Sequence, residues 1–292
     1  MSRYRFIDTE QATYPVTILC HVLGVARSGY YAWRHRGVSA RAQANQELSA
    51  QIRLIHERSR GTYGVPRVQA ELHAAGVRCG SKRIARLMRA AGLVGRSRRR
   101  RTHTTRVDPS QVPAPNLVAR TFTVAAPDRR WVGDLTYIPT WEGWLYLAVL
   151  LDAYSRRVVG WAMAEHLRTE LPLAALQGAL QQRRPPTGLV HHTDRGSQYT
   201  AAAYQAVLET HQVTASMSRA SNCYDNALAE SFFATLKTEL IETRPWPTRR
   251  AAQHAVFEWI EVFYNRQRRH SALGYRSPVA FEMRCEKEVV AA

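Results

Sequence analysis

Three apolar segments that follow one another between residues 131 and 164 constrain the fold of this chain the most. They read WVGDLTYIPT, GWLYLAVLLDAYS and RRVVGWAMA, and a turn near Glu142 and Gly143 separates the first two. Short apolar runs bounded by turn residues predict strands. Because only a tight turn joins the first two runs, we expect them to pair as antiparallel neighbours.

The segments that follow alternate between helical and strand-like patterns. Leucines at 171, 173, 176 and 180 predict an amphipathic helix over 169–183, and GLVHHTD predicts a short strand after it. A helix over 200–210, a strand in VTASMS and a helix from about 225 to 242 are expected next. This order predicts an α/β fold, a mixed sheet flanked by helices and preceded by a helical N-terminal region.

Positive charge is concentrated in the first third of the chain. The formal net charge is +18; residues 1–110 contain 21 Lys and Arg against 6 Asp and Glu, and residues 111–292 contain 20 against 17. Such asymmetry favours a polyanionic partner, nucleic acid, over general solubility. No stretch of the sequence reaches the roughly 20 apolar residues that span a bilayer, so we expect no membrane association.

The basic region has the patterns of small DNA-binding helices. LCHVLGVARSGYYAW resembles a helix-turn-helix, with Gly24 in the turn and Ser28 as a candidate N-cap. A helix over 45–58 and two further helices in VPRVQAELHAAG and SKRIARLMRAAG follow, the last with Ser81 as a candidate N-cap. Basic side chains on the polar side of this last helix and in the arginine run after it are candidate DNA contacts: Lys82, Arg83, Arg86, Arg89, Arg98, Arg99, Arg100 and Arg101. A solvated basic face and a plain packing hairpin are the alternatives.

A Thr- and Pro-rich segment, THTTRVDPSQVPAPNLV, separates the basic helices from the strands. We therefore expect an N-terminal helix-turn-helix-like segment over 1–44, a basic helical DNA-binding domain over 45–101 and a linker over 102–125. A catalytic core over 126–243 and a C-terminal helical extension over 244–292 complete the expected organisation.

Cysteine usage and the N-terminal sequence favour a reduced compartment. The four cysteines lie far apart with no CxxC pair, which indicates neither a zinc site nor a disulfide framework. MSRYRFIDTE has no apolar core, so it does not resemble a secretory signal. His191 and His192 are neighbours on a predicted strand and point to opposite faces, so we expect at least one of them to be structural. The expected location is a reducing cytosol.

Three carboxylates, Asp134, Asp194 and Glu230, are the candidate catalytic residues. Asp134 lies on a predicted strand, Asp194 just after another, and Glu230 on a predicted helix. Acids gathered in a basic chain repel each other, and divalent cations relieve that repulsion. Two cations about 3.5–4 Å apart suit in-line attack at a phosphodiester. The oxygen ligands favour two Mg²⁺ or Mn²⁺ ions over zinc.

The helix that carries Glu230 presents other polar groups on the same side. At about 100° per residue, Asn226, Glu230 and Lys237 fall within about 40° of one another, so Lys237 and Asn226 are candidate DNA contacts. Asp225 or Asn222 is the expected cap of this helix. Asp152 is interpreted as a residue that braces the turn before the third strand.

Four stretches together resemble one family. WVGDLTYIPT, LDAYSRRVVGW, HHTDRGSQYT and SNCYDNALAESFFATLKTEL are similar to the core of OrfB-type insertion-sequence transposases, whose cores are similar to retroviral integrases. The 35 residues between Asp194 and Glu230 fit the family's spacing, as does Lys237 seven positions after the Glu. The resemblance implies a ribonuclease H-like fold, a DDE site that uses Mg²⁺, and DNA strand cleavage followed by strand transfer from a 3′-OH.

The resemblance also implies partners. The expected ones are the terminal inverted repeats of the element, target DNA, further copies of this chain, and an OrfA-type protein or fusion from an upstream frame. A catalytically silent DNA-binding protein and a ribonuclease H-type nuclease are the alternative functions. For the basic residues of the C-terminal tail, DNA contact and a purely structural role both remain open: Arg266, Arg268, Arg269 and His270.

Overall fold

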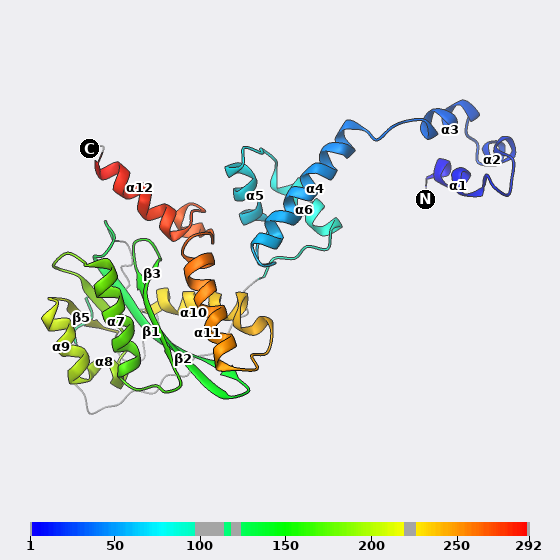
Figure 1. The fold of residues 1–292 in the computed structure, drawn as a ribbon. Coiled ribbons are helices and arrows are strands. Elements are labelled where there is room, and N and C mark those ends of the chain that lie inside the picture. The colour runs from blue at the N-terminus through cyan, green and yellow to red at the C-terminus, as the bar shows by residue number, and fades with distance from the viewer. Residues whose placement is uncertain (1, 97–113, 118–123, 219–225, 291–292) are drawn as a thin grey trace.

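The computed structural model describes residues 2–96, 114–117, 124–218 and 226–290, with the side chains of 286–290 left out. The chain begins with three short helices, α1 (Arg3–Glu10), α2 (Val16–Val22) and α3 (Arg27–Arg34). They share a small core made of Ile7, Leu19, Cys20 and Tyr30. Figure 1 shows these helices apart from the rest of the molecule and joined to it through α4.

A second helical unit consists of α4 (Ala40–Arg58), α5 (Val65–Ala74) and α6 (Ser81–Ala90). Its core contains apolar residues that recur at helical spacing on all three elements, as the sequence pattern predicts: Leu48, Ile52, Val68, Leu72, Ile84 and Met88. Two predicted caps are wrong. Ser28 lies inside α3, which begins after Ala26, and Ser81 is the first residue of α6, whose N-cap is Gly80.

The five described strands form one mixed sheet in the order β3-β2-β1-β4-β5. The strands are β1 (Arg130–Thr140), β2 (Gly143–Asp152), β3 (Val158–Ala164), β4 (Val190–Thr193) and β5 (Thr214–Met217). The first three pair as antiparallel neighbours with a turn at Trp141–Glu142, as predicted. β4 pairs in parallel with β1 and with β5. β4 pairs with β1 only at Arg130–Val132, so the residues of β1 after Val132 do not pair with β4.

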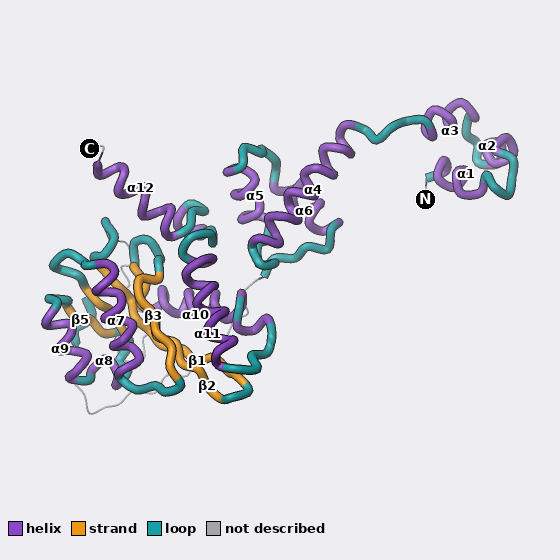
Figure 2. The backbone as a smooth tube through the Cα atoms, in the orientation of Figure 1, coloured by secondary structure: helices purple, strands orange, loops and turns teal. Residues whose placement is uncertain are grey.

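Helices cover both faces of the sheet (Figure 2). α7 (Glu170–Arg183), α8 (Ser197–Thr200) and α9 (Ala202–Thr210) enclose one core with alternate residues of the strands, among them Trp131, Ala148 and Leu150. α10 (Ala227–Glu239) and α11 (Arg249–Glu258) enclose the other core with the residues in between, among them Val132 and Leu151. Successive side chains of one strand therefore point alternately into two separate cores.

The C-terminal segment winds back over the core. It contains the 3₁₀ turns Ile241–Thr243 and Ser271–Leu273, the π-helical turn Trp259–Tyr264 and α12 (Pro278–Val290). Glu282 anchors α12, because its carboxylate accepts hydrogen bonds from Ser155, Arg157 and Arg183. None of the helices in the described part of the chain is long and apolar enough to cross a membrane.

The helical unit of α4–α6 packs on the core through apolar and polar contacts. Its buried residues belong to one hydrophobic cluster with those of α10 and α11, and the rings of Tyr63 and Phe263 lie 6.5 Å apart. Arg60 donates to Glu258 of α11, and Arg67 donates to the backbone oxygen of Arg269 at 3.0 Å. The guanidinium of Arg269 in turn pairs with Glu71 at 2.6 Å. The C-terminal segment thus lies between the helical unit and the sheet. The predicted linker and the arginine run from 98 to 101 lie almost wholly outside the described residues.

Candidate active site

Asp134 and Asp194 extend from neighbouring parallel strands. Asp134 follows Val132 by two positions on β1, so its side chain is on the face that α10 and α11 cover. Asp194 comes directly after β4. One oxygen of Asp134 accepts the N–H of Leu135 at 2.8 Å, and one oxygen of Asp194 accepts the N–H of Gly196 at 3.0 Å. The end of a parallel pair is where open sheets position functional groups.

Glu230 reaches the same region from α10. Leu228, Phe232 and Leu236 are buried on the side of this helix that packs on the core, as predicted. Glu230 and Lys237 are half-buried, on another side of the helix. The packing of the leucine side therefore fixes the direction in which the carboxylate and the ammonium group project.

The three carboxylates interact electrostatically. The pKa of Asp134 is raised to about 8, first because burial removes water from the carboxylate and then because the negative charge of Asp194 lies near it. Glu230 raises it further, whereas the Leu135 N–H and the positive charge of Lys237 lower it. Burial also raises the pKa of Asp194, against the hydrogen bond from Gly196. Four of the residues predicted for the site are thus near one another.

In the described part of the chain, no group of three His, Cys, Asp or Glu side chains is already arranged to hold a metal ion. The donor set nonetheless fits a hard divalent cation, because it consists of carboxylates alone. Burial first, and then repulsion from Asp194 and Glu230, raises the pKa of Asp134 toward the neutral form. A cation between them would relieve that repulsion.

Asn226 and Lys237 differ in their surroundings. Asn226 is the N-cap residue of α10; it is buried, and its side-chain oxygen has no hydrogen-bond partner. The ammonium of Lys237 lies 5.2 Å from the centre of the Tyr137 ring, which meets Trp144 edge-on at 4.9 Å. Both aromatic side chains are about half exposed. Sequence reasoning missed Tyr137, because a residue three positions after Asp134 on the same strand points to the opposite face of the sheet.

Comparison with known proteins decides the family. An integrase core domain matches residues 124–223, another integrase core domain matches 211–278, and an HTH-like domain matches 43–101. The chain is 46% identical over 263 residues to a 31 kDa protein of insertion element IS600 from Shigella sonnei, covering 90% of this chain and 97% of that one. It is 41% identical to the transposase InsF of IS3A from Escherichia coli K12, covering 96% and 98%.

The chain belongs to the OrfB-type transposases of insertion sequences. It is a DDE transposase with an integrase core, and its HTH-like and integrase domains imply that it binds DNA. Among solved structures, it is similar to the HTLV-2 integrase catalytic core domain in complex with magnesium, at 17% identity and a TM-score of 0.41, covering 54% of this chain and 97% of that one. A simian T-cell lymphotropic virus intasome chain is similar at 16% identity and a TM-score of 0.44, covering 73% and 70%.

The candidate DNA contacts of this transposase on α6 are mostly open to solvent. Lys82, Arg86 and Arg89 are exposed, whereas Arg83 is half-buried and donates to the side-chain oxygen of Asn45 at 2.9 Å. Three residues therefore present charge to solvent and one also holds α6 to α4. Arg98, Arg99, Arg100 and Arg101 lie outside the described residues, as do Asn222 and Asp225, the expected caps of α10.

Several polar residues of the transposase have structural partners. His191 shares a hydrogen bond with Tyr204 at 2.8 Å, and His192 contacts Ser216 and Ser218 at 2.9 and 3.1 Å. Both histidines are buried, so the prediction that at least one is structural is confirmed. Asp152 braces its turn as predicted, by accepting the N–H groups of Asp128 and Ser155.

The tail residues divide between the two alternatives left open by the sequence. Arg268 is buried and pairs with Glu239 through two hydrogen bonds of 2.7 Å. Arg269 pairs with Glu71, and His270 has a pKa well below its ordinary value because of burial and the nearby arginines. Arg266 is exposed. Arg268 and Arg269 thus have structural partners, and only Arg266 is presented openly to solvent.

Proposed function

We propose that Asp134, Asp194 and Glu230 hold the divalent cations with which this transposase cuts the ends of its element and joins them to target DNA. The observation that supports this most directly is the pKa of Asp134, which burial and then the negative charges of Asp194 and Glu230 raise to about 8. The three residues come from β1, from the end of β4 and from α10, so the fold gathers them from distant parts of the chain.

Two Mg²⁺ or Mn²⁺ ions, when bound, supply Lewis-acid stabilisation of the attacking and leaving oxygens of a phosphodiester. The Leu135 and Gly196 N–H groups orient the carboxylates of Asp134 and Asp194. We infer that Lys237 meets a DNA phosphate beside Glu230 and that Asn226 positions the strand. The positive charge of Lys237 then also favours the ionised form of Asp134.

The DNA that the transposase binds is proposed to be the terminal inverted repeats of its element together with target DNA, in the bacterial cytoplasm and at the nucleoid. The proposed grip consists of basic residues on and after α6: Lys82, Arg83, Arg86, Arg89, Arg98, Arg99, Arg100 and Arg101. Further copies of the chain and an OrfA-type partner or fusion complete the proposed assembly. The division at 44/45, 101/102, 125/126 and 243/244 stays a prediction.

A strand-transfer assay on a labelled element end tests this function. With Mg²⁺ or Mn²⁺, the wild-type protein is expected to join the DNA 3′-OH end to a target. Asp194→Asn should reduce joined product at least 100-fold while leaving DNA binding intact. Glu209→Gln on α9, an exposed acid, is the matched control and should retain activity. Equal activity of Asp194→Asn and wild type refutes the assignment, and hydrolysis without joining would indicate a nuclease instead.

A further inference from the structure

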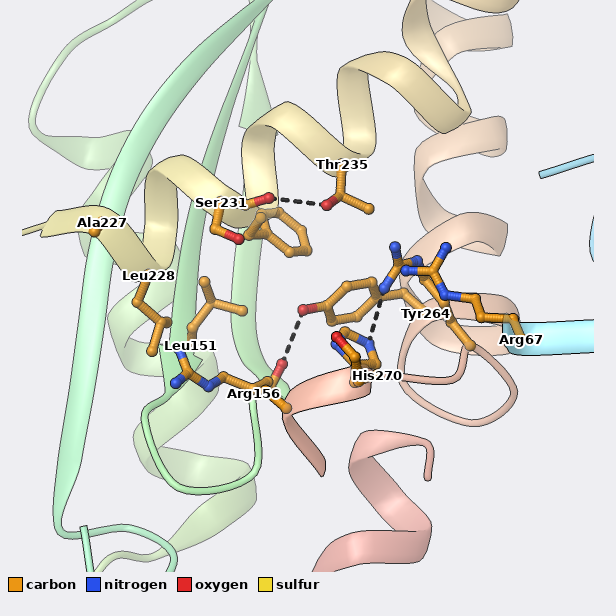
Figure 3. Close-up of a pocket in the computed structure, with 13 residues that line it drawn as sticks. Arg67, Leu151, Arg156, Ala227, Leu228, Ser231, Thr235, Tyr264 and His270 are labelled. Carbon is orange, nitrogen blue, oxygen red and sulfur yellow. Dashed lines mark hydrogen bonds between the residues drawn. The ribbon is translucent and has the colours of Figure 1, made fainter. Parts of the chain in front are cut away.

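A pocket of about 320 Å³ with basic side chains in its wall lies on a different side of α10 from Glu230. Ser231 and Thr235 of α10 line one wall, and Arg67, Arg156, Arg268 and His270 surround the rest. The basic side chains come from three separate parts of the chain (Figure 3). Arg67 is on α5, Arg156 is in the turn after β2, and His270 is in the C-terminal segment. The pocket opens toward solvent at Ser271 and Ala272, which are exposed.

The charges around this pocket do not balance. Glu239 pairs with Arg268 through two hydrogen bonds of 2.7 Å and also lies 3.6 Å from Arg67, so one carboxylate serves two guanidinium groups. Arg156 makes no side-chain hydrogen bond or ion pair with any residue that the structure describes. The acid that raises its pKa, Asp152, already accepts hydrogen bonds from Asp128 and Ser155. The pocket therefore carries excess positive charge.

Arg156 has an uncommon backbone conformation. Its φ of 63° is in the left-handed region, where glycine or asparagine is at ease and a long side chain is uncommon. Burial is the largest cause that lowers the pKa of its guanidinium, against the charges of Tyr264 and Asp152. Tyr264 fixes the turn by donating to the backbone oxygen of Arg156 at 3.1 Å. Such a desolvated cation has high affinity for an anion that completes it.

The shape and chemistry of the pocket select a phosphate group. Arginine presents N–H donors in a planar fork that matches phosphate oxygens. The pocket also lies at the first turns of α10, where Ala227 and Leu228 contribute to its wall and the side chain of Asn226 makes no capping hydrogen bond. The positive end of the helix dipole thus adds to the arginine charges.

We propose that this pocket binds one backbone phosphate of the DNA that the transposase holds, with Arg156 as its principal ligand. The inference rests on the proposed DNA-strand-transfer function. Arg67 belongs to the unit of α4–α6, Arg156 to the sheet, and Arg268 to the C-terminal segment, so a single phosphate joins all three. Because α10 also carries Glu230, a DNA strand bound in this pocket has a fixed position relative to that catalytic acid.

The first experiment uses inorganic phosphate and thermal unfolding of the full chain at constant ionic strength. Phosphate should raise the melting temperature of the wild type, and Arg156→Gln should abolish that rise. Without phosphate, Arg156→Gln should be at least as stable as wild type, because it removes a partly buried charge that pairs with no acid among the described residues. Arg156→Gly also relieves the left-handed backbone, and it should behave in the same way. Arg250→Gln, an exposed arginine of α11, is the charge-matched control and should keep the phosphate response.

The second experiment identifies the source of the phosphate group. Binding of a duplex that carries the element's terminal repeat is measured at several salt concentrations. Arg156→Gln should weaken binding about tenfold and lower the salt slope by about 0.9, whereas Arg250→Gln should change neither. Neutral methylphosphonate linkages placed along the duplex should reveal one position that weakens wild-type binding and has no further effect on Arg156→Gln.

Each outcome decides the inference. A phosphate response without any coupled methylphosphonate position means that the pocket binds free phosphate only, which overturns the proposal. Unchanged affinity and slope in Arg156→Gln overturn it as well. These results are separate from the strand-transfer test of Asp194→Asn. If Asp194→Asn loses joining while Arg156→Gln binds normally, this inference alone fails; if binding depends on Arg156 but no joining occurs, the proposed function alone fails.

Discussion

Arg268 and Glu239 illustrate how a single buried ion pair can hold a tail to a core. Both side chains are 5% exposed, and the guanidinium donates two hydrogen bonds to the carboxylate. Arg268→Met should lower the free energy of unfolding by about 3–5 kcal/mol, because Glu239 is left buried without its main partner. Urea unfolding measures the change. The double variant Arg268→Met/Glu239→Met should recover most of it, and an equally unstable double variant would show that the pair is not the cause.

Glu282 gives the transposase a pH-dependent contribution to stability. Burial raises the pKa of its carboxyl, but hydrogen bonds from Ser155 and Arg157 and the charge of Arg183 outweigh burial, so the folded pKa is below the ordinary value of 4.5. A group whose folded pKa is lowered stabilises above its ordinary pKa, and that stability is lost as pH falls through the folded pKa. Glu282→Gln should therefore cost about 3 kcal/mol at pH 7.

The difference between wild type and Glu282→Gln should shrink as the pH falls below about 4.5, where the wild-type carboxyl also becomes neutral. Denaturant unfolding at pH 7, 5 and 3.5 measures it. Glu209→Gln, which alters an exposed acid, should show no such trend. A destabilisation of equal size at all three pH values would argue against an electrostatic role for Glu282.

At the same scale, the sequence indicated some residues and not others. Asp134, Asp194 and Glu230 stood in recognisable motifs, and Asp152 followed a strand where a turn was needed. The environment of Arg156 was not predictable, because most residues that line its pocket are about 70 to 115 positions away in sequence. Ser28 and Ser81 look like caps locally, yet α3 and α6 begin one or more residues earlier than those side chains require.

At the scale of elements, the approach of α7 to β3 depends on a missing side chain. A Cβ at Gly160 would lie 2.6 Å from Cβ of Ala179 and would also clash with the backbone oxygen of Ala175. Gly160→Ala should therefore destabilise the protein by about 1–3 kcal/mol, because neither contact is with a flexible side chain. Thermal or denaturant unfolding measures the effect.

Gly178 in α7 is the matched control for Gly160, since a Cβ there would meet nothing within 4 Å. Gly178→Ala should stabilise the protein by about 0.5–1 kcal/mol, because glycine in a helix interior has excess freedom in the unfolded chain. If both substitutions had the same sign, close helix–strand packing would not explain the requirement for glycine at 160.

Element patterns were readable wherever one face is buried and the other is not. The strands β1–β3, the helix α7 and the leucine side of α10 follow the expected periods. α1 was missed because its eight residues bury only Ile7, which leaves no stripe to detect. α4 begins at Ala40, five residues before the predicted start, because Ser39 caps it by accepting the N–H of Ala42.

At the scale of the whole molecule, the sequence predicted the parts better than their assembly. Charge asymmetry and the proline-rich segment indicated a basic helical region ahead of an α/β core. Docking of α4–α6 on the core depends on pairs such as Arg60 with Glu258, which are 198 residues apart in sequence. Local patterns carry no information about which distant acid an arginine meets, so this arrangement required the structure.

The assembly predicts different consequences for two truncations of the transposase. No hydrogen bond, ion pair or ring contact joins residues 2–36 to the rest of the described chain, and these residues have their own small core. Removing residues 1–36 should therefore leave the melting temperature of the remainder unchanged while weakening binding to the element end. Removing residues 1–96 also removes Arg60, Arg67 and Glu71, the partners of Glu258, Glu239 and Arg269.

The longer truncation should melt at a lower temperature, because the buried Glu239 of α10 and the half-buried Arg269 of the C-terminal segment each lose a partner. Arg268 keeps Glu239, so the segment should remain attached and the core should still fold. Differential scanning calorimetry of the full chain and both truncations measures the three midpoints. Equal midpoints for the two truncations would mean that α4–α6 contributes nothing to the stability of the core, and the single-phosphate link between them would then lose its structural basis.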